Sequence, residues 1–145
     1  MGSQQANYGE GDATYRACGG EAGIRKLVDA FYDHMDRDAA YATIRSMHPS
    51  DLTVSRDKLS RFLCAWTGGP KLFSEKYGAI SIPRVHAHLP ITEVERDLWL
   101  GAMAAALTEQ PYPADLILYL QQQLAVPAER IRQHRASIGR EPGTG

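Results

Sequence analysis

The sequence predicts an all-α protein. Apolar residues recur at helical spacing in several long segments, no segment shows the alternation of a half-buried strand, and corners rich in glycine and proline separate the segments. The chain has 145 residues, which is enough for one hydrophobic core, and no internal repeat is apparent. We therefore expect one domain in which helices pack around a single core.

The composition favours small-molecule partners. Charged residues make up 23% of the chain and the formal net charge is -1, so no excess of positive charge is available for a nucleic-acid surface. No apolar run is long enough to span a bilayer, and the first residues lack the basic start and apolar centre of a signal peptide. Cys18 and Cys64 are too few for a disulfide scaffold, so we expect a cytoplasmic protein with neither nucleic acid nor membrane as partner.

We expect the folded domain to span residues 16–138. Residues 1–15 are rich in Gly, Gln and Ser and predict a flexible N-terminal extension, and residues 139–145 predict a flexible C-terminal tail. The predicted helices lie between these two ends.

The first two long helices are predicted beside corners that contain paired glycines. The first helix begins near Ile24, after a glycine-rich corner, and its apolar face consists of Ile24, Leu27, Val28, Phe31, Tyr32 and Met35. Residues 36–48 predict a helix end followed by a short helix. The second helix stops at the corner formed by residues 67–70, and its apolar stripe consists of Leu52, Leu59, Phe62, Leu63 and Trp66.

The second half of the chain predicts a loop and two further helices. Residues 72–84 contain glycine and proline and show no sustained period, so we expect an ordered loop with at most short helical turns. Thr92 and Glu95 form a capping box for the third helix, which keeps one apolar face. A fourth helix is expected over residues 114–125, and Pro127 is expected to kink or end it unless it opens a new turn.

Five histidines are candidates for chemistry: His34, His48, His86, His88 and His134. None shows the His-x-x-x-His spacing of a helical zinc site, and the two cysteines do not form a zinc-ligand pair. The His86-x-His88 pair can chelate a metal ion, although no further ligand is evident. A single histidine suffices when a haem supplies the other donors, whereas a lone histidine is more commonly a surface or structural residue. The residues alone leave these interpretations open.

The order of several short motifs resembles that of the truncated haemoglobins, and more closely their group II. The shared features are the Gly19-Gly20 corner, the Phe31-Tyr32 pair, FLCAWTGGP from Phe62, KLFSEKYG after it, the histidine segment and ERDLWLGAM from Glu95. The resemblance covers roughly Gly19 to Leu124. It implies a truncated globin fold, in which two helices pack over two others around haem b, and an iron that binds oxygen and other diatomic ligands.

The resemblance places the proximal iron ligand between the second double-glycine corner and the helix that bears Trp99. His86 fits both the spacing from Pro70 and the spacing to Trp99 without a gap. His88 matches only locally, because many relatives have R-H-x-P-F here and this chain continues with Leu-Pro-Ile. It would also require a deletion before Trp99. We therefore predict that His86 ligates the iron, with His88 as the alternative.

The distal side of the implied pocket has three polar candidates. The resemblance assigns the ligand-stabilising tyrosine to Tyr32, the indole donor to Trp99 and a third polar position to His48. Their O–H and N–H groups are donors for a diatomic ligand that takes on partial negative charge. Without the resemblance, Tyr32 and Trp99 are more often core residues, and His48 is more often an exposed turn residue.

Other residues complete the implied pocket. Ser55 occupies the usual distal-histidine position, and the apolar lining consists of Leu59, Phe62, Leu63 and Met103. The candidates to bind the haem propionates are Lys71, Lys76 and Arg84. Such cations are more often simply solvated, and relatives often carry Arg before the proximal histidine, where this chain has Val85.

The implied function is ligand binding with slow release, which suits storage, sensing or redox detoxification better than simple transport. A haem-dependent peroxidase or nitric oxide dioxygenase, supplied by an unidentified reductant, is the alternative. A globin-like sensor or interaction domain without haem is the second alternative. The sequence makes no prediction of the oligomeric state.

Overall fold

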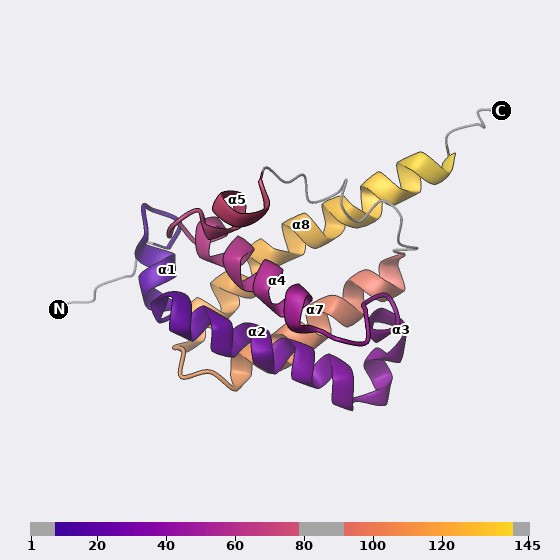
Figure 1. Ribbon diagram of the computed structural model, residues 1–145, viewed down its shortest axis with the longest axis horizontal. Coiled ribbons are helices and arrows are strands. Elements are labelled where there is room, and N and C mark those ends of the chain that lie inside the picture. Colours follow the sequence, from indigo (N-terminus) through magenta and orange to yellow (C-terminus); the bar gives the residue numbers. More distant parts are fainter. Residues whose placement is uncertain (1–7, 79–91, 141–145) are drawn as a thin grey trace.

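Two pairs of long helices form the body of the protein. The computed structural model describes residues 8–78 and 92–140, and all regular secondary structure in these residues is helical. Helices α2 (Gly20–Arg37) and α4 (Thr53–Trp66) lie in front of α7 (Glu93–Thr108) and α8 (Ala114–Arg140) (Figure 1). Helix α2 contacts both α4 and α7, and α7 packs along α8. The predicted all-α fold with two helices over two is confirmed.

Short helices join the long ones. They are α1 (Ala13–Ala17), the 3-10 helix η1 (Ala39–Tyr41), α3 (Ala42–Arg45) and α5 (Leu72–Tyr77). The predicted end of the first long helix and the short helix after it are therefore confirmed. Helix α5 is short, as expected for residues 72–77, and the rest of the expected loop, from residue 79, lies outside the described residues.

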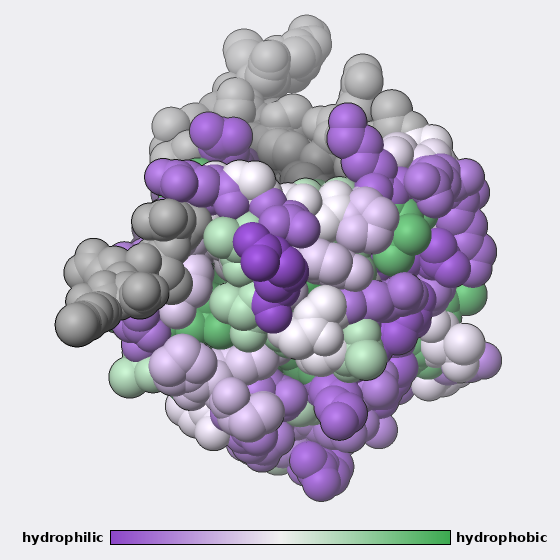
Figure 2. All heavy atoms as spheres, turned by 90° about the vertical axis from the view of Figure 1, so that its left-hand side faces the viewer, coloured by the Kyte–Doolittle hydropathy of each residue, from purple (hydrophilic) through white to green (hydrophobic). Residues whose placement is uncertain are grey.

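The core is built from the apolar faces that the sequence predicts. All six apolar positions predicted for the first helix are buried, and so are Leu116, Leu120 and Leu124 of α8. Helix α2 begins at Gly20, four residues before its first buried apolar side chain, Ile24. A Cβ atom at Gly23 would lie 2.0 Å from the carbonyl oxygen of Cys18, so glycine is required where α1 meets α2. The face that carries α1 and the start of α2 shows polar residues with small apolar patches between them (Figure 2).

Helix α1 is packed against the end of α4. The backbone N–H of Tyr15 donates to the carbonyl oxygen of Thr67 over 3.1 Å. The Tyr15 ring covers Gly69, where an added Cβ would lie 2.4 Å from the ring. Farther back, the Tyr8 hydroxyl donates to Asp115 of α8. Tyr8 and Tyr15 thus have partners on α8 and at the end of α4, which composition does not reveal.

The start of α7 and the turn of α8 that lies beside it are held by polar contacts. The predicted capping box of Thr92 and Glu95 at the start of α7 is confirmed. Helix α8 continues through Pro127 to Arg140, so the helix does not end at the proline. Proline removes one backbone hydrogen bond, but Glu129, two residues later, accepts from Arg96 of α7 over 2.5 Å and holds this turn against α7. Among the described residues, no helix is long and apolar enough to cross a membrane.

Candidate distal ligand pocket

Tyr32 presents a hydroxyl group that is available to donate. Its side chain is only 5% exposed, on the face of α2 that packs into the core. Within the described part of the chain, the Tyr32 hydroxyl has no hydrogen-bond partner. Every fully buried side-chain oxygen or nitrogen in that part does have a partner, so the Tyr32 hydroxyl is not fully buried. The hydroxyl therefore borders accessible space. Burial raises the pKa of Tyr32 well above its ordinary value, against the opposing charge of Arg56, so the proton stays on the oxygen.

His48 contacts Tyr32 edge to face. The two ring centroids are 5.6 Å apart and the ring planes are nearly perpendicular. His48 follows α3, and its Nδ1 lies 2.9 Å from the carbonyl oxygen of Ile44 in that helix. A carbonyl oxygen only accepts, so Nδ1 carries the proton of the neutral imidazole and Nε2 is an acceptor. The structure thus brings together the predicted Tyr32 and His48, but it limits His48 as a donor.

Trp99 reaches the same region from α7. Its ring packs against Phe31, with 5.2 Å between the centroids, and Phe31 also contacts Tyr32 at 4.9 Å. The Trp99 side chain is half-buried, and its indole N–H has no acceptor among the described residues. Met103, one turn later, is buried in the core. Phe31, which the sequence analysis placed only in the core, therefore joins the two aromatic donors.

Helix α4 contributes half-buried side chains, of which Leu59 and Phe62 pack against the core cluster that contains Tyr32. Ser55, Leu59 and Phe62 lie at helical spacing on one side of α4 and are half-buried. Leu63 is fully buried and belongs to the core between α2 and α4. Half-buried apolar side chains beside unpaired aromatic donors are typical of a ligand pocket.

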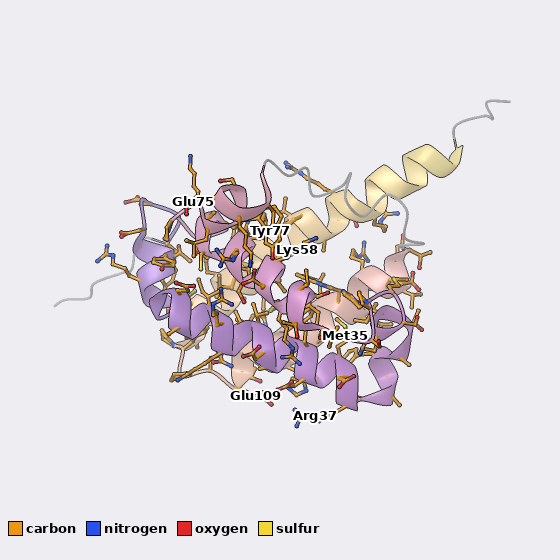
Figure 3. The ribbon with its side chains drawn as sticks, in the orientation of Figure 1. Met35, Arg37, Lys58, Glu75, Tyr77 and Glu109 are labelled. Carbon is orange, nitrogen blue, oxygen red and sulfur yellow. The ribbon has the colours of Figure 1, made fainter. Side chains whose placement is uncertain are left out.

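A cavity of about 470 Å³ opens where α2 ends, next to His48. Its lining includes Met35 and Arg37, which Figure 3 labels, together with Arg45 and His48. Arg45 binds Asp36 over 2.8 Å and the carbonyl oxygens of residues 49 and 50, which fixes the loop after His48. These contacts of Arg45 hold the part of the cavity lining that is next to His48.

The two lysines predicted to bind the haem propionates, Lys71 and Lys76, lie in different environments. Lys71 is exposed at the start of α5, and Lys76 donates to Asp57 of α4 over 2.9 Å. Asp57 also accepts from Tyr77 over 2.7 Å, and its remaining donors are Arg25 and Arg61. The Tyr77 ring packs beside the ammonium group of Lys58 at 5.3 Å (Figure 3). Burial favours a raised pKa for Asp57, but the hydrogen bonds from its four donors hold that pKa far below its usual range.

This arrangement around Asp57 was not predictable from the sequence. A lone Asp at a half-buried helix position gives no signal, because its donors come from three helices. The remaining predicted site residues, His86, His88 and Arg84, lie outside the described residues.

Comparisons with known proteins agree on one group of relatives. The sequence profile of the bacterial-like globins matches residues 13–131. The group 2 truncated hemoglobin YjbI of Bacillus subtilis is 36% identical over 96 residues, which are 66% of this chain and 70% of that protein. The group II 2-on-2 hemoglobin of Agrobacterium tumefaciens has a similar structure, with a TM-score of 0.79, 32% identity and coverage of 91% of this chain and 98% of that one. The truncated oxygen-avid haemoglobin of Bacillus subtilis matches with a TM-score of 0.74 and 30% identity, covering 81% of this chain and 97% of that one.

Proposed function

The chain belongs to the bacterial-like globin family, and on this premise we propose that it holds oxygen tightly at a haem iron whose protein ligand is His86. Haem b is the usual cofactor of the family, and it supplies the iron that binds the diatomic ligand. The described residues fit this group, because Leu59 and Phe62 offer half-buried apolar surface against the core cluster that contains Tyr32, whose hydroxyl has no partner among the described residues.

The observation that carries the proposal is the Tyr32 hydroxyl. It keeps its proton, lies on a buried side chain and has no competing acceptor among the described residues. We assign it as the main hydrogen-bond donor to the ligand and the Trp99 indole as the second. Two donors at about 0.5 to 1.5 kcal/mol each slow ligand release roughly 5- to 150-fold.

The proximal assignment rests on spacing. His86 stands at the family distance from the Pro70 corner and from Trp99, whereas His88 needs a deletion. Arg84 and Lys71 are proposed to meet the propionates, while Lys76 already donates to Asp57. If haem is bound, Arg84 and Lys71 would supply charged donors for its propionates, and the apolar side chains of α4 would supply apolar contacts.

Slow release favours storage, sensing or redox detoxification over transport. Peroxidase activity is the second candidate, because the Tyr32 hydroxyl and the Trp99 indole N–H are donors that can polarise a peroxide as well as oxygen. Turnover of a peroxide also needs a reductant. Cys18 and Cys64 are buried thiols, which fits a reducing, cytoplasmic compartment.

The test begins with absorption spectra. Purified protein reconstituted with haem is expected to show a Soret band, and His86→Ala is expected to weaken haem binding or change the iron's ligation. If His86→Ala leaves the spectrum intact and His88→Ala disrupts it, the assignment of the proximal ligand is wrong. If neither the wild type nor any variant binds haem, the protein is a haem-free globin-like domain. Oxygen release measured beside peroxide turnover separates a carrier from an enzyme.

A further inference from the structure

Arg56 of α4 is clamped against Tyr32 by two carboxylates of α2. Its Nη1 donates to Asp29, to the carbonyl oxygen over 3.2 Å and to Oδ1 over 3.1 Å. Its Nη2 donates to Oδ1 of Asp33 over 2.9 Å. The guanidinium carbon then lies over the Tyr32 ring, 5.7 Å from the centroid. Asp29 and Asp33 are one helical turn apart on the same side of α2, so both reach one arginine.

We propose that Arg56 is a positioning residue that strengthens the Tyr32 hydroxyl as a hydrogen-bond donor to the haem ligand. The inference rests on the proposed function, because it deepens the role given there to Tyr32. A cation over the face of a phenol ring is attracted to the ring electrons and draws density from the hydroxyl oxygen, which makes the O–H group a stronger donor. The clamp also restricts the ring, so that the hydroxyl keeps one direction.

The two carboxylates do not cancel the charge of Arg56 at the ring. The side chains of Asp29 and Asp33 are 59% and 49% exposed, whereas that of Arg56 is 27% exposed. Water therefore screens the carboxylates more than it screens the guanidinium group. Burial raises the pKa of Tyr32, and the charge of Arg56 opposes that rise. The net electric field at the Tyr32 ring is therefore dominated by the positive charge of Arg56.

Arg61 of α4 supplies a matched control. Its side chain is 24% exposed and its guanidinium group is bound to a carboxylate, that of Asp57. Among the described residues it does not lie over an aromatic ring. Arg56→Gln and Arg61→Gln therefore remove the same charge from the same helix, but only the first removes it from Tyr32.

The experiment measures oxygen release and two spectroscopic signals in haem-loaded protein. Arg56→Gln is expected to release oxygen about two- to fivefold faster. It is also expected to raise the C–O stretching frequency of the carbon monoxide complex, because the positive field weakens. Arg56→Lys is expected to fall closer to wild type, and Arg61→Gln to match it. In protein labelled with 3-fluorotyrosine, the Tyr32 fluorine resonance, identified by its loss in Tyr32→Phe, is expected to shift in Arg56→Gln alone.

A double-mutant cycle decides between this role and a general structural one. In a Tyr32→Phe background, Arg56→Gln is expected to change oxygen release no further. An equal effect in both backgrounds, or wild-type release with an unmoved fluorine resonance, would overturn the inference. If Arg56→Gln does not fold, Arg56→Met keeps the apolar stem and is read in the same way. Failure of the proposed function looks different, because there the Soret band is absent or Tyr32→Phe itself leaves oxygen release unchanged.

Discussion

The Nδ1 atom of His48 lies 2.9 Å from the carbonyl oxygen of Ile44, and this contact fixes which ring nitrogen carries the proton of the neutral imidazole. Because the carbonyl only accepts, the neutral imidazole donates its single N–H to Ile44. The Tyr32 hydroxyl and the Trp99 indole N–H, in contrast, have no acceptor among the described residues. Tyr32 and Trp99 are therefore the stronger candidates to donate to a ligand.

Tyr32→Phe is expected to speed oxygen release by about two- to tenfold or more, because it removes the main donor. The same change is expected to alter the free energy of unfolding by less than about 1 kcal/mol, because the hydroxyl has no partner to lose among the described residues. Trp99→Phe is expected to have a smaller effect on release. Thermal unfolding beside the kinetic measurement checks both parts, and a large loss of stability in Tyr32→Phe would show that the hydroxyl has a structural role.

Gly23→Ala is expected to destabilise the fold by about 1 to 3 kcal/mol, because the new Cβ would lie 2.0 Å from the Cys18 carbonyl oxygen and α1 would have to move. Gly101→Ala in α7 is the matched control. There the nearest atom, the Tyr41 hydroxyl oxygen, is 3.6 Å from the added Cβ, so that change is expected to be neutral or to stabilise by up to about 1 kcal/mol. Denaturant unfolding measures both, and equal losses would show that close packing at Gly23 is not the cause.

Asp57→Asn is expected to cost about 1 to 3 kcal/mol at neutral pH, because four donors lose a charged acceptor. The folded-state pKa of Asp57 lies far below its usual range, so its contribution is complete above the unfolded-state pKa. That contribution is lost as the pH falls through the depressed folded-state value, and the gap between wild type and variant is expected to narrow in acid. Asp12→Asn, which breaks one exposed ion pair with Arg16, is expected to change stability by less than about 0.5 kcal/mol.

The parts of the fold that the sequence predicts are those with a local cause. The capping box of Thr92 and Glu95 and the apolar face of α2 each depend on residues within a few turns of one another. The start of α2 at Gly20 was not predicted, because its first turn carries no apolar signal. Likewise, Pro127 signals a helix end locally, and the contact of Glu129 with α7 that holds this turn is known only once both helices are placed.

In the candidate site, too, motif order predicts some features, whereas others depend on how the helices pack. Motif order predicted that Tyr32, His48 and Trp99 lie in one region. It did not predict the ring contact of Tyr32 with His48 or the link to Trp99 through Phe31, which the structure shows. The direction of the His48 ring was not predictable, because it depends on the carbonyl of Ile44 and hence on where α3 ends. Arg56 was missed for a related reason. The sequence alone does not indicate a role for Arg56, because its position over the Tyr32 ring depends on how α2 and α4 cross.

Because the ring of Tyr15 lies over Gly69, substitutions at positions 15 and 69 are expected to be correlated in evolution. A side chain at position 69 would overlap the Tyr15 ring, so the glycine is demanded by the tyrosine as much as by its own corner. Among related chains, a larger residue at position 69 is expected only where position 15 carries a small one. The residues at positions 15 and 69 are therefore expected to change together. A larger residue at position 69 with Tyr15 retained is expected to be selected against.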